Sequence, residues 1–178
     1  MEYVRITDGS HSINYLEKAV SFIESAATKP GDWVWAVLAV HGALYGFTIC
    51  NVKGTDSDSV CTGEKKKRLI NFNEALERCQ DPAYMNYGGF TKVLELSENQ
   101  KRALRELSGF RNEFVHYKGA FWSIPEAALR GTLMHAWDVL HAVREMGCFY
   151  PRFEPGDGGR IAALVTKGKG LLQNAHRE

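Results

Sequence analysis

The sequence predicts an all-α protein, a bundle of four long helices plus one shorter helix. Apolar residues recur every three or four positions over most of the chain, which is the period of a helix with one buried face. No segment of useful length alternates apolar and polar residues as a half-buried strand does. The chain has 178 residues, 44% of them hydrophobic and 24% charged, which suffices for one domain with a buried core.

The first predicted helix ends before residue 30. Its core positions lie three or four residues apart, at Ile13, Leu16, Val20, Ile23 and Ala27. Pro30 and Gly31 end this helix, and Asp32 can cap the one that follows.

The second predicted helix, residues 33–50, carries no formal charge over 18 residues. That length reaches the lower limit of a membrane-spanning helix. His41, Gly42 and Gly46 dilute its apolar character, however, and no second span follows. We therefore expect no membrane segment. Instead we expect a helix buried on all sides at the centre of the bundle, with His41 as a core histidine rather than a catalyst.

The third helix is the shorter one, and it follows a loop at residues 51–64 that is rich in Gly, Ser, Thr and Asp. Its apolar positions are Leu69, Phe72, Leu76 and Cys79, and it should end before Pro82. Ser97 with Gln100 resembles a capping box for a fourth helix, and Ser123 with Glu126 resembles one for a fifth.

The fifth helix has a regular apolar stripe and a C-terminal stop at Gly147. The stripe consists of Leu129, Leu133, Ala136, Leu140 and Val143. We therefore divide the chain into a helical domain, residues 1–147, and a Pro- and Gly-containing C-terminal extension, residues 148–178, whose structure the pattern leaves unassigned.

Charge and cysteine content limit the possible functions. The net charge of +1 excludes nucleic-acid binding by bulk positive charge, so any RNA site must be local. The four cysteines have no metal-site spacing, and no N-terminal segment resembles a signal peptide. We expect a cytoplasmic protein without a metal or other cofactor.

The segment SGFRNEFVHYKG, residues 108–119, places polar groups inside an apolar helical stretch. On a helix over residues 98–118, the predicted core stripe is Ala103, Leu107, Phe110, Phe114 and Tyr117. The opposite, basic and polar face holds Lys101, Arg102, Arg105, Ser108, Gly109, Asn112 and His116. Arg111 lies on the shoulder between these faces, and Asn112 and His116 should be neighbours because they are four residues apart.

RNEFVH resembles the motif of the HEPN superfamily, the higher eukaryotes and prokaryotes nucleotide-binding domains. In that motif an arginine and a following polar residue precede a histidine, here Arg111, Asn112 and His116. HEPN domains are small all-α bundles with the motif in a late helix. The resemblance therefore implies a HEPN-like bundle over about residues 10–147, by helix order.

The resemblance also implies an activity. Many HEPN proteins are metal-independent endoribonucleases of toxin-antitoxin, abortive-infection and phage-defence systems, and they act as dimers. By this resemblance, the chain is a homodimer that cleaves RNA through attack by the 2'-hydroxyl at a composite site. The sequence leaves open whether an antitoxin or other regulatory partner controls it. Arginine can hold two phosphate oxygens and histidine can exchange protons near neutral pH, so Arg111 is the expected phosphate clamp and His116 the acid/base, with Asn112 in support. The expected RNA-binding residues are Lys101, Arg102, Arg105 and Lys118.

Two interpretations of the motif stay open. The alternative to an enzyme is a non-catalytic HEPN module that dimerises or binds a nucleotide or RNA. Other candidates are weaker: residues 64–68, EKKKR, are a possible RNA contact or a solvated face. His135, Asp138 and His141 spread too far around a helix to predict a metal site.

Overall fold

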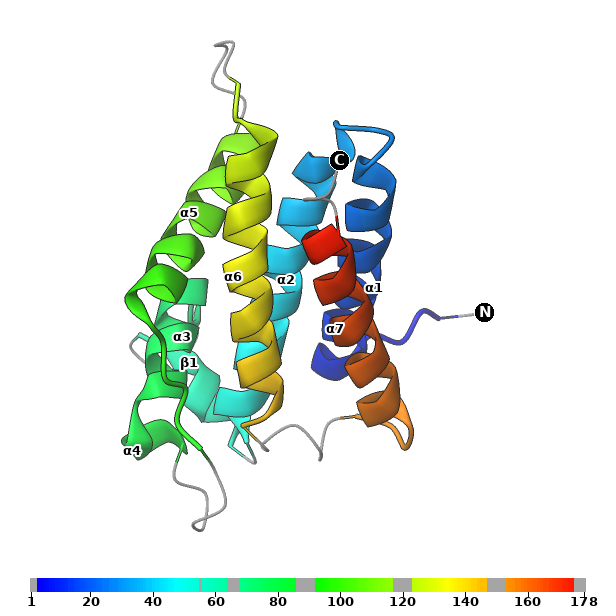
Figure 1. The fold of residues 1–178 in the computed structure, drawn as a ribbon. Coiled ribbons are helices and arrows are strands. Elements are labelled where there is room, and N and C mark those ends of the chain that lie inside the picture. The colour runs from blue at the N-terminus through cyan, green and yellow to red at the C-terminus, as the bar shows by residue number, and fades with distance from the viewer. Residues whose placement is uncertain are drawn as a thin grey trace.

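The computed structural model describes residues 3–54, 56–63, 68–85, 92–116, 123–146 and 153–174. Its helices, shown in Figure 1, are α1 (Asp8–Ala26), α2 (Asp32–Lys53), α3 (Phe72–Gln80), α4 (Pro82–Met85), α5 (Glu98–Val115), α6 (Glu126–Arg144) and α7 (Asp157–Asn174). A 3-10 turn (Ser57–Val60) and the antiparallel strands β1 (Cys61–Thr62) and β2 (Arg68–Leu69) connect α2 to α3. The prediction of an all-α protein is confirmed, and the five predicted helices correspond to α1, α2, α3, α5 and α6.

Side-chain caps begin several of these helices. The capping box of Ser97 and Gln100 is formed at the start of α5, as predicted. The predicted box of Ser123 and Glu126 is wrong, because Pro125 is the N-cap of α6 and makes no side-chain cap. The Glu126 carboxylate instead accepts a hydrogen bond from Arg130, one turn further on.

Asp32 does not cap α2. It is the first helical residue, Gly31 is the N-cap, and no side chain caps this end. The Asp32 carboxylate accepts a hydrogen bond from the Ser25 hydroxyl of α1 instead, so it ties together the two helices that Pro30 and Gly31 separate.

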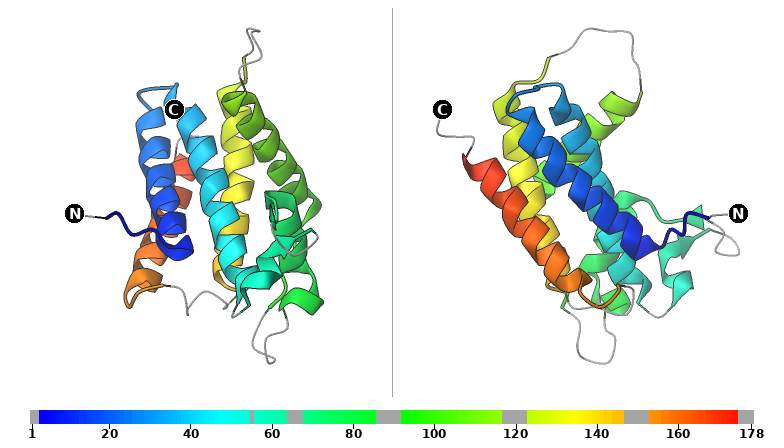
Figure 2. Two further views of the ribbon diagram at one scale, coloured as in Figure 1. Left: turned by 180° about the vertical axis from the view of Figure 1, so that it is seen from behind. Right: turned by 90° about the vertical axis from the view of Figure 1, so that its right-hand side faces the viewer.

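Helix α2 lies at the centre of the bundle, in contact with α1, α3, α5 and α6 (Figures 1 and 2). By length and composition it could cross a membrane, but 61% of its most apolar window is buried inside the protein. The prediction of burial on all sides is wrong for one stripe. Val34, Leu38, His41 and Tyr45 follow each other at helical spacing and are only half-buried.

Two glycines of α2 allow α1 to approach closely. A Cβ on Gly42 would lie 2.5 Å from Cδ1 of Tyr15, and one on Gly46 would collide with the Ser12 hydroxyl. Since such overlaps force the backbones apart, glycine is required at both positions for this packing. The glycines that diluted the apolar pattern therefore serve the contact between these helices.

The segment that the sequence left unassigned forms α7, which packs against α1 and α6. The Trp137 indole of α6 donates a hydrogen bond of 2.8 Å to the Val165 carbonyl, and Gly168 lies against the same ring. At the surface, Lys167 pairs with Glu24 of α1 at 2.8 Å. The residues on either side of the proposed division at residue 147 thus pack in one bundle, although residues 147–152 lie outside the described part of the chain.

Candidate functional site

A cavity of about 760 Å³ lies between α1, α2, the start of α3 and α5. Its walls come from the N-terminal half of α1, the half-buried stripe of α2, the start of α3 with the preceding residues, and the C-terminal half of α5. The left view of Figure 2 shows the bundle from behind, with α2 between α1 and α5. The cavity thus collects side chains from four separate parts of the sequence.

Arg111 and Asn112 reach this cavity from α5. The buried residues Ala103, Leu104 and Leu107 turn one side of the helix towards the core, and Arg111, four residues after Leu107, continues that side. Arg111 is half-buried as a residue, and its guanidinium donates an exposed hydrogen bond of 3.0 Å to Oδ1 of Asn112. No carboxylate pairs with Arg111 within the described ranges, so its remaining donors are available to an anion.

His41 faces the same cavity from α2, and the sequence did not predict this role. Its ring centroid lies 4.4 Å from that of Phe72, the first residue of α3. Burial, and then the positive charge of Arg111, lower the pKa of His41 to about 4. His41 is therefore neutral at pH 7, with one ring nitrogen as a donor and the other as an acceptor. The available signal was a histidine inside the run of residues 33–50, which carries no formal charge, followed directly by glycine.

Tyr45 and Asp8 also line the cavity but are engaged within the protein. The Tyr45 hydroxyl donates to the Ile70 carbonyl, and burial, with a smaller effect of the Glu74 charge, raises the Tyr45 pKa. The Asp8 carboxylate pairs with Lys53 at 2.7 Å. Arg111 is therefore the one cavity-lining cation without an ion pair among the described residues.

His116 is separated from this cavity in the single protomer. Helix α5 ends at Val115, and His116 is its C-cap, with an extended backbone and an exposed side chain. The helix predicted over residues 98–118 therefore ends early, and the expected placement of Asn112 and His116 on one helix face does not apply. The two residues are joined instead through the backbone, where the His116 amide donates to the Asn112 carbonyl at 3.0 Å.

The predicted core stripe of α5 is confirmed only in part. Ala103 and Leu107 are buried, but Phe110 and Phe114 are half-buried and stack on each other, with centroids 6.4 Å apart. The fifth member, Tyr117, lies outside the described residues. The buried face of α5 is instead centred near Leu104 and Leu107, which turns Arg111 inward.

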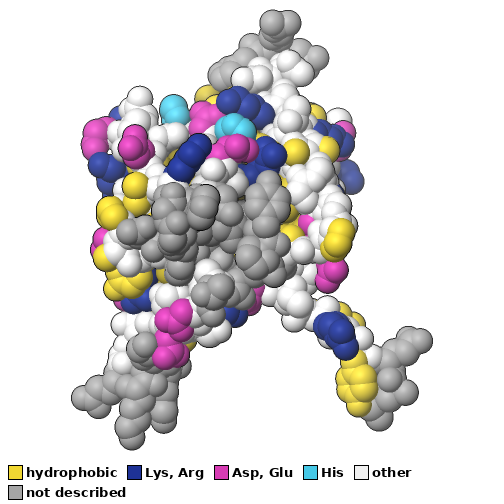
Figure 3. All heavy atoms as spheres, turned by 90° about the horizontal axis from the view of Figure 1, so that it is seen from below, with side chains coloured by type: hydrophobic (Ala, Val, Ile, Leu, Met, Phe, Trp, Pro, Cys, Tyr) yellow, Lys and Arg dark blue, Asp and Glu magenta, His cyan; other side chains and the backbone are white. Residues whose placement is uncertain are grey.

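Three of the predicted RNA-binding residues, Lys101, Arg102 and Arg105, do not line the cavity. Lys101 pairs with Glu98 at 2.8 Å, and Arg102 donates to Asn99 at 3.1 Å. Arg105 is exposed, and Lys118 lies outside the described residues. On the end of the bundle shown in Figure 3, basic and acidic side chains are interspersed over the described surface.

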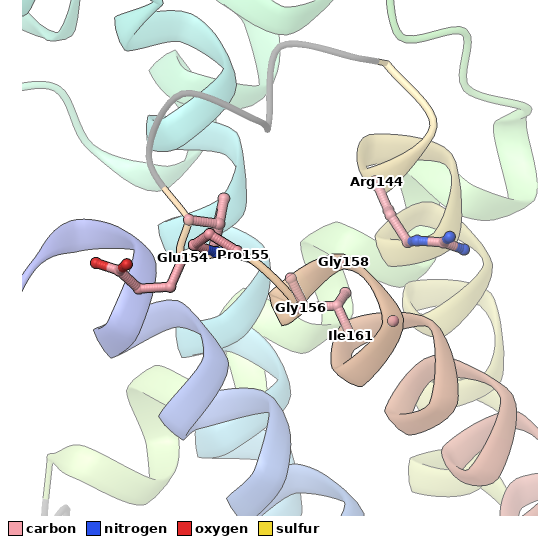
Figure 4. A pocket seen from close by; sticks show the side chains of 8 residues that line it. Arg144, Glu154, Pro155, Gly156, Gly158 and Ile161 are labelled. Carbon is pink, nitrogen blue, oxygen red and sulfur yellow. The ribbon is translucent and has the colours of Figure 1, made fainter.

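The other candidates from the sequence are the metal site and the segment EKKKR. In the described ranges, no three His, Cys, Asp or Glu side chains gather as metal ligands, and Asp138 pairs with Lys169 at 2.8 Å. A second cavity, of about 370 Å³, lies at the glycine-rich start of α7. Its two charged side chains, Arg144 and Glu154, point away from each other (Figure 4). Of the segment EKKKR, residues 64–67 lie outside the described residues.

No protein-family model, curated protein or solved structure matches the chain.

Proposed function

We propose that this protein is a metal-independent endoribonuclease of the HEPN type, which acts as a cytoplasmic homodimer in a toxin-antitoxin or phage-defence role. The observation that carries the proposal is the Arg111 guanidinium. It lines a large cavity beside Asn112 and has no carboxylate partner among the described residues. A half-buried arginine without a counter-ion is suited to hold an anionic ligand such as a phosphodiester.

The chemistry requires one further group. Cleavage by the 2'-hydroxyl needs a proton acceptor, a cation to stabilise the phosphorane and a proton donor for the leaving 5'-oxygen. Arg111 is the cation in this proposal, and Asn112 orients it. His116 accepts the proton of the 2'-hydroxyl and supplies a proton to the leaving 5'-oxygen.

A second protomer would bring the two parts together. Arg111 lines the cavity, whereas His116 stands exposed at the end of α5, so a two-fold axis near this end places the His116 of one copy beside the Arg111 of the other. Large apolar side chains that line the cavity remain unusually exposed: Tyr15 at 37%, Leu69 at 51% and Val115 at 43%. Such a rim is suited to cover by another chain.

Incubation of the pure protein with mixed RNA in EDTA, with mapping of the product ends, tests the activity. We expect 2',3'-cyclic phosphate ends, and no cut at a position with a 2'-deoxy nucleotide. His116→Ala should abolish cleavage, and His141→Ala, an exposed histidine of α6 outside the cavity, should leave it unchanged. If the His116→Ala protein cuts as fast as the parent, the assignment is wrong; if the parent cuts no RNA, the protein is not a nuclease.

A further inference from the structure

The cavity beside Arg111 is much larger than a phosphate requires. Pockets for small organic ligands typically occupy about 300 to 1,000 Å³, and this one measures about 760 Å³. Of the two residues proposed for cleavage, Arg111 lines the cavity from α5 and His116 does not line it. The rest of the cavity, between α1, α2 and the start of α3, has no role in the proposed chemistry.

Aromatic side chains stand on two sides of the cavity. His41 contacts Phe72 on the side of α3, and the next residue of α2, Gly42, lies against the Tyr15 ring of α1. Tyr15 in turn meets the His11 ring edge-on, with centroids 4.7 Å apart. Flat apolar surfaces of this kind bind a planar ring, and nucleobases stack on such side chains irrespective of base identity.

Polar groups without partners lie in the same walls. The Ser108 hydroxyl of α5 is shielded from solvent and has no hydrogen-bond partner among the described residues. Leaving such a group unpaired costs free energy, so a ligand that bonds to it gains affinity. Neutral His41 offers a donor and an acceptor, and the exposed Asn73 side chain offers both as well.

The charge of the cavity favours an anionic ligand. Among the described residues that line it, the one carboxylate, that of Asp8, pairs with Lys53, and Arg111 has no carboxylate partner. If the phosphate binds at Arg111, the attached sugar and base can enter the space lined by Ser108, His41 and Tyr15. We propose that each protomer binds one unstacked nucleotide of its RNA substrate here, its phosphate on Arg111 and its base held and read by His41, Ser108 and Asn73. This rests on the proposed nuclease function and adds a substrate class, RNA whose base is free of a duplex, and residues that select the base.

Calorimetric titration of the wild-type protein at pH 7 with the four nucleoside 5'-monophosphates, ribose 5-phosphate and inorganic phosphate tests this. At least one nucleotide should bind about tenfold or more tightly than ribose 5-phosphate, a difference of about 1.4 kcal/mol. Arg111→Gln should weaken all the phosphate ligands. His41→Gln and Asn73→Ala should each remove most of the preference for the nucleotide while leaving ribose 5-phosphate binding unchanged.

Asn73 is exposed, so its variant reports on binding even if His41→Gln fails to fold. His141→Gln is the matched control and should bind as the parent does. Equal affinity for nucleotides and ribose 5-phosphate, or a preference that survives both substitutions, overturns the inference. Because these titrations need no cleavage, their failure is separable from that of the nuclease. RNA cleavage without a base preference in these titrations would support the proposed nuclease and contradict the base-binding pocket. Base binding without RNA cleavage would support the pocket and contradict the nuclease.

Discussion

Protonation of His41 should destabilise the fold in mildly acidic solution. The pKa of His41 is about 4 in the folded protein and 6.5 in the unfolded chain, so between these pH values the unfolded state binds a proton that the folded state excludes. Stability is therefore lost as pH falls from about 6.5 towards 4. At about 1.4 kcal/mol for each pKa unit, the full effect is about 3 kcal/mol. Because the side chain is only half-buried, water screens part of it, and we expect about 1 to 3 kcal/mol.

Urea unfolding of the parent and of His41→Gln, at pH values from 7.5 to 4, measures this effect. Gln cannot be protonated, so the stability of the parent relative to the variant should fall by about 1 to 3 kcal/mol over the range. Common carboxylate effects cancel in this difference. The other charged or titratable groups that line the cavity, Asp8, His11, Tyr15, Tyr45 and Arg111, are present in both proteins. A difference between parent and His41→Gln that is constant with pH would show that His41 is not held neutral beside Arg111.

Packing predictions concern α5 and α7. Leu107→Ala should lower the free energy of unfolding by about 2 to 5 kcal/mol in urea titrations, because Leu107 is fully buried. Phe114→Ala should cost less, because Phe114 is half-buried. Equal costs would contradict a buried face of α5 that is centred near Leu104 and Leu107. Gly168→Ala should lower the melting temperature, because its Cβ would collide with the Trp137 ring, whereas Gly170→Ala, with open space at that position, should raise stability by about 0.5 to 1 kcal/mol. If both glycine variants melt alike in thermal scans, α7 does not pack on Trp137 as described.

Local signals in the sequence were sufficient to predict most of the helices. Regular apolar spacing marked α1, α5 and α6, and the box of Ser97 with Gln100 marked the start of α5. These signals act between residues a few positions apart, so they need no knowledge of the rest of the chain. Pro125 shows their limit, since it replaced Ser123 as the cap although the Ser-Glu spacing was correct.

Helix α7 escaped prediction because its own residues favour helix weakly. It contains four glycines, at 158, 159, 168 and 170, and each lowers helix propensity. Its stability comes from contacts with α1 and α6, among them the Trp137 hydrogen bond to Val165 and the close approach at Gly168. A residue that weakens the isolated helix thus permits the packing that stabilises it.

The sequence by itself determined the helical class of the protein and singled out Arg111 and Asn112, because helical periodicity and a short motif are properties of neighbouring residues. Tertiary structure decided what surrounds them. The rotation of α5 depends on which residues fit against α6 and α2, and it turned Arg111 towards the interior. His41 lies seventy positions earlier, and the charge of Arg111 affects it only because α2 and α5 pack together. No local pattern therefore contained this electrostatic coupling.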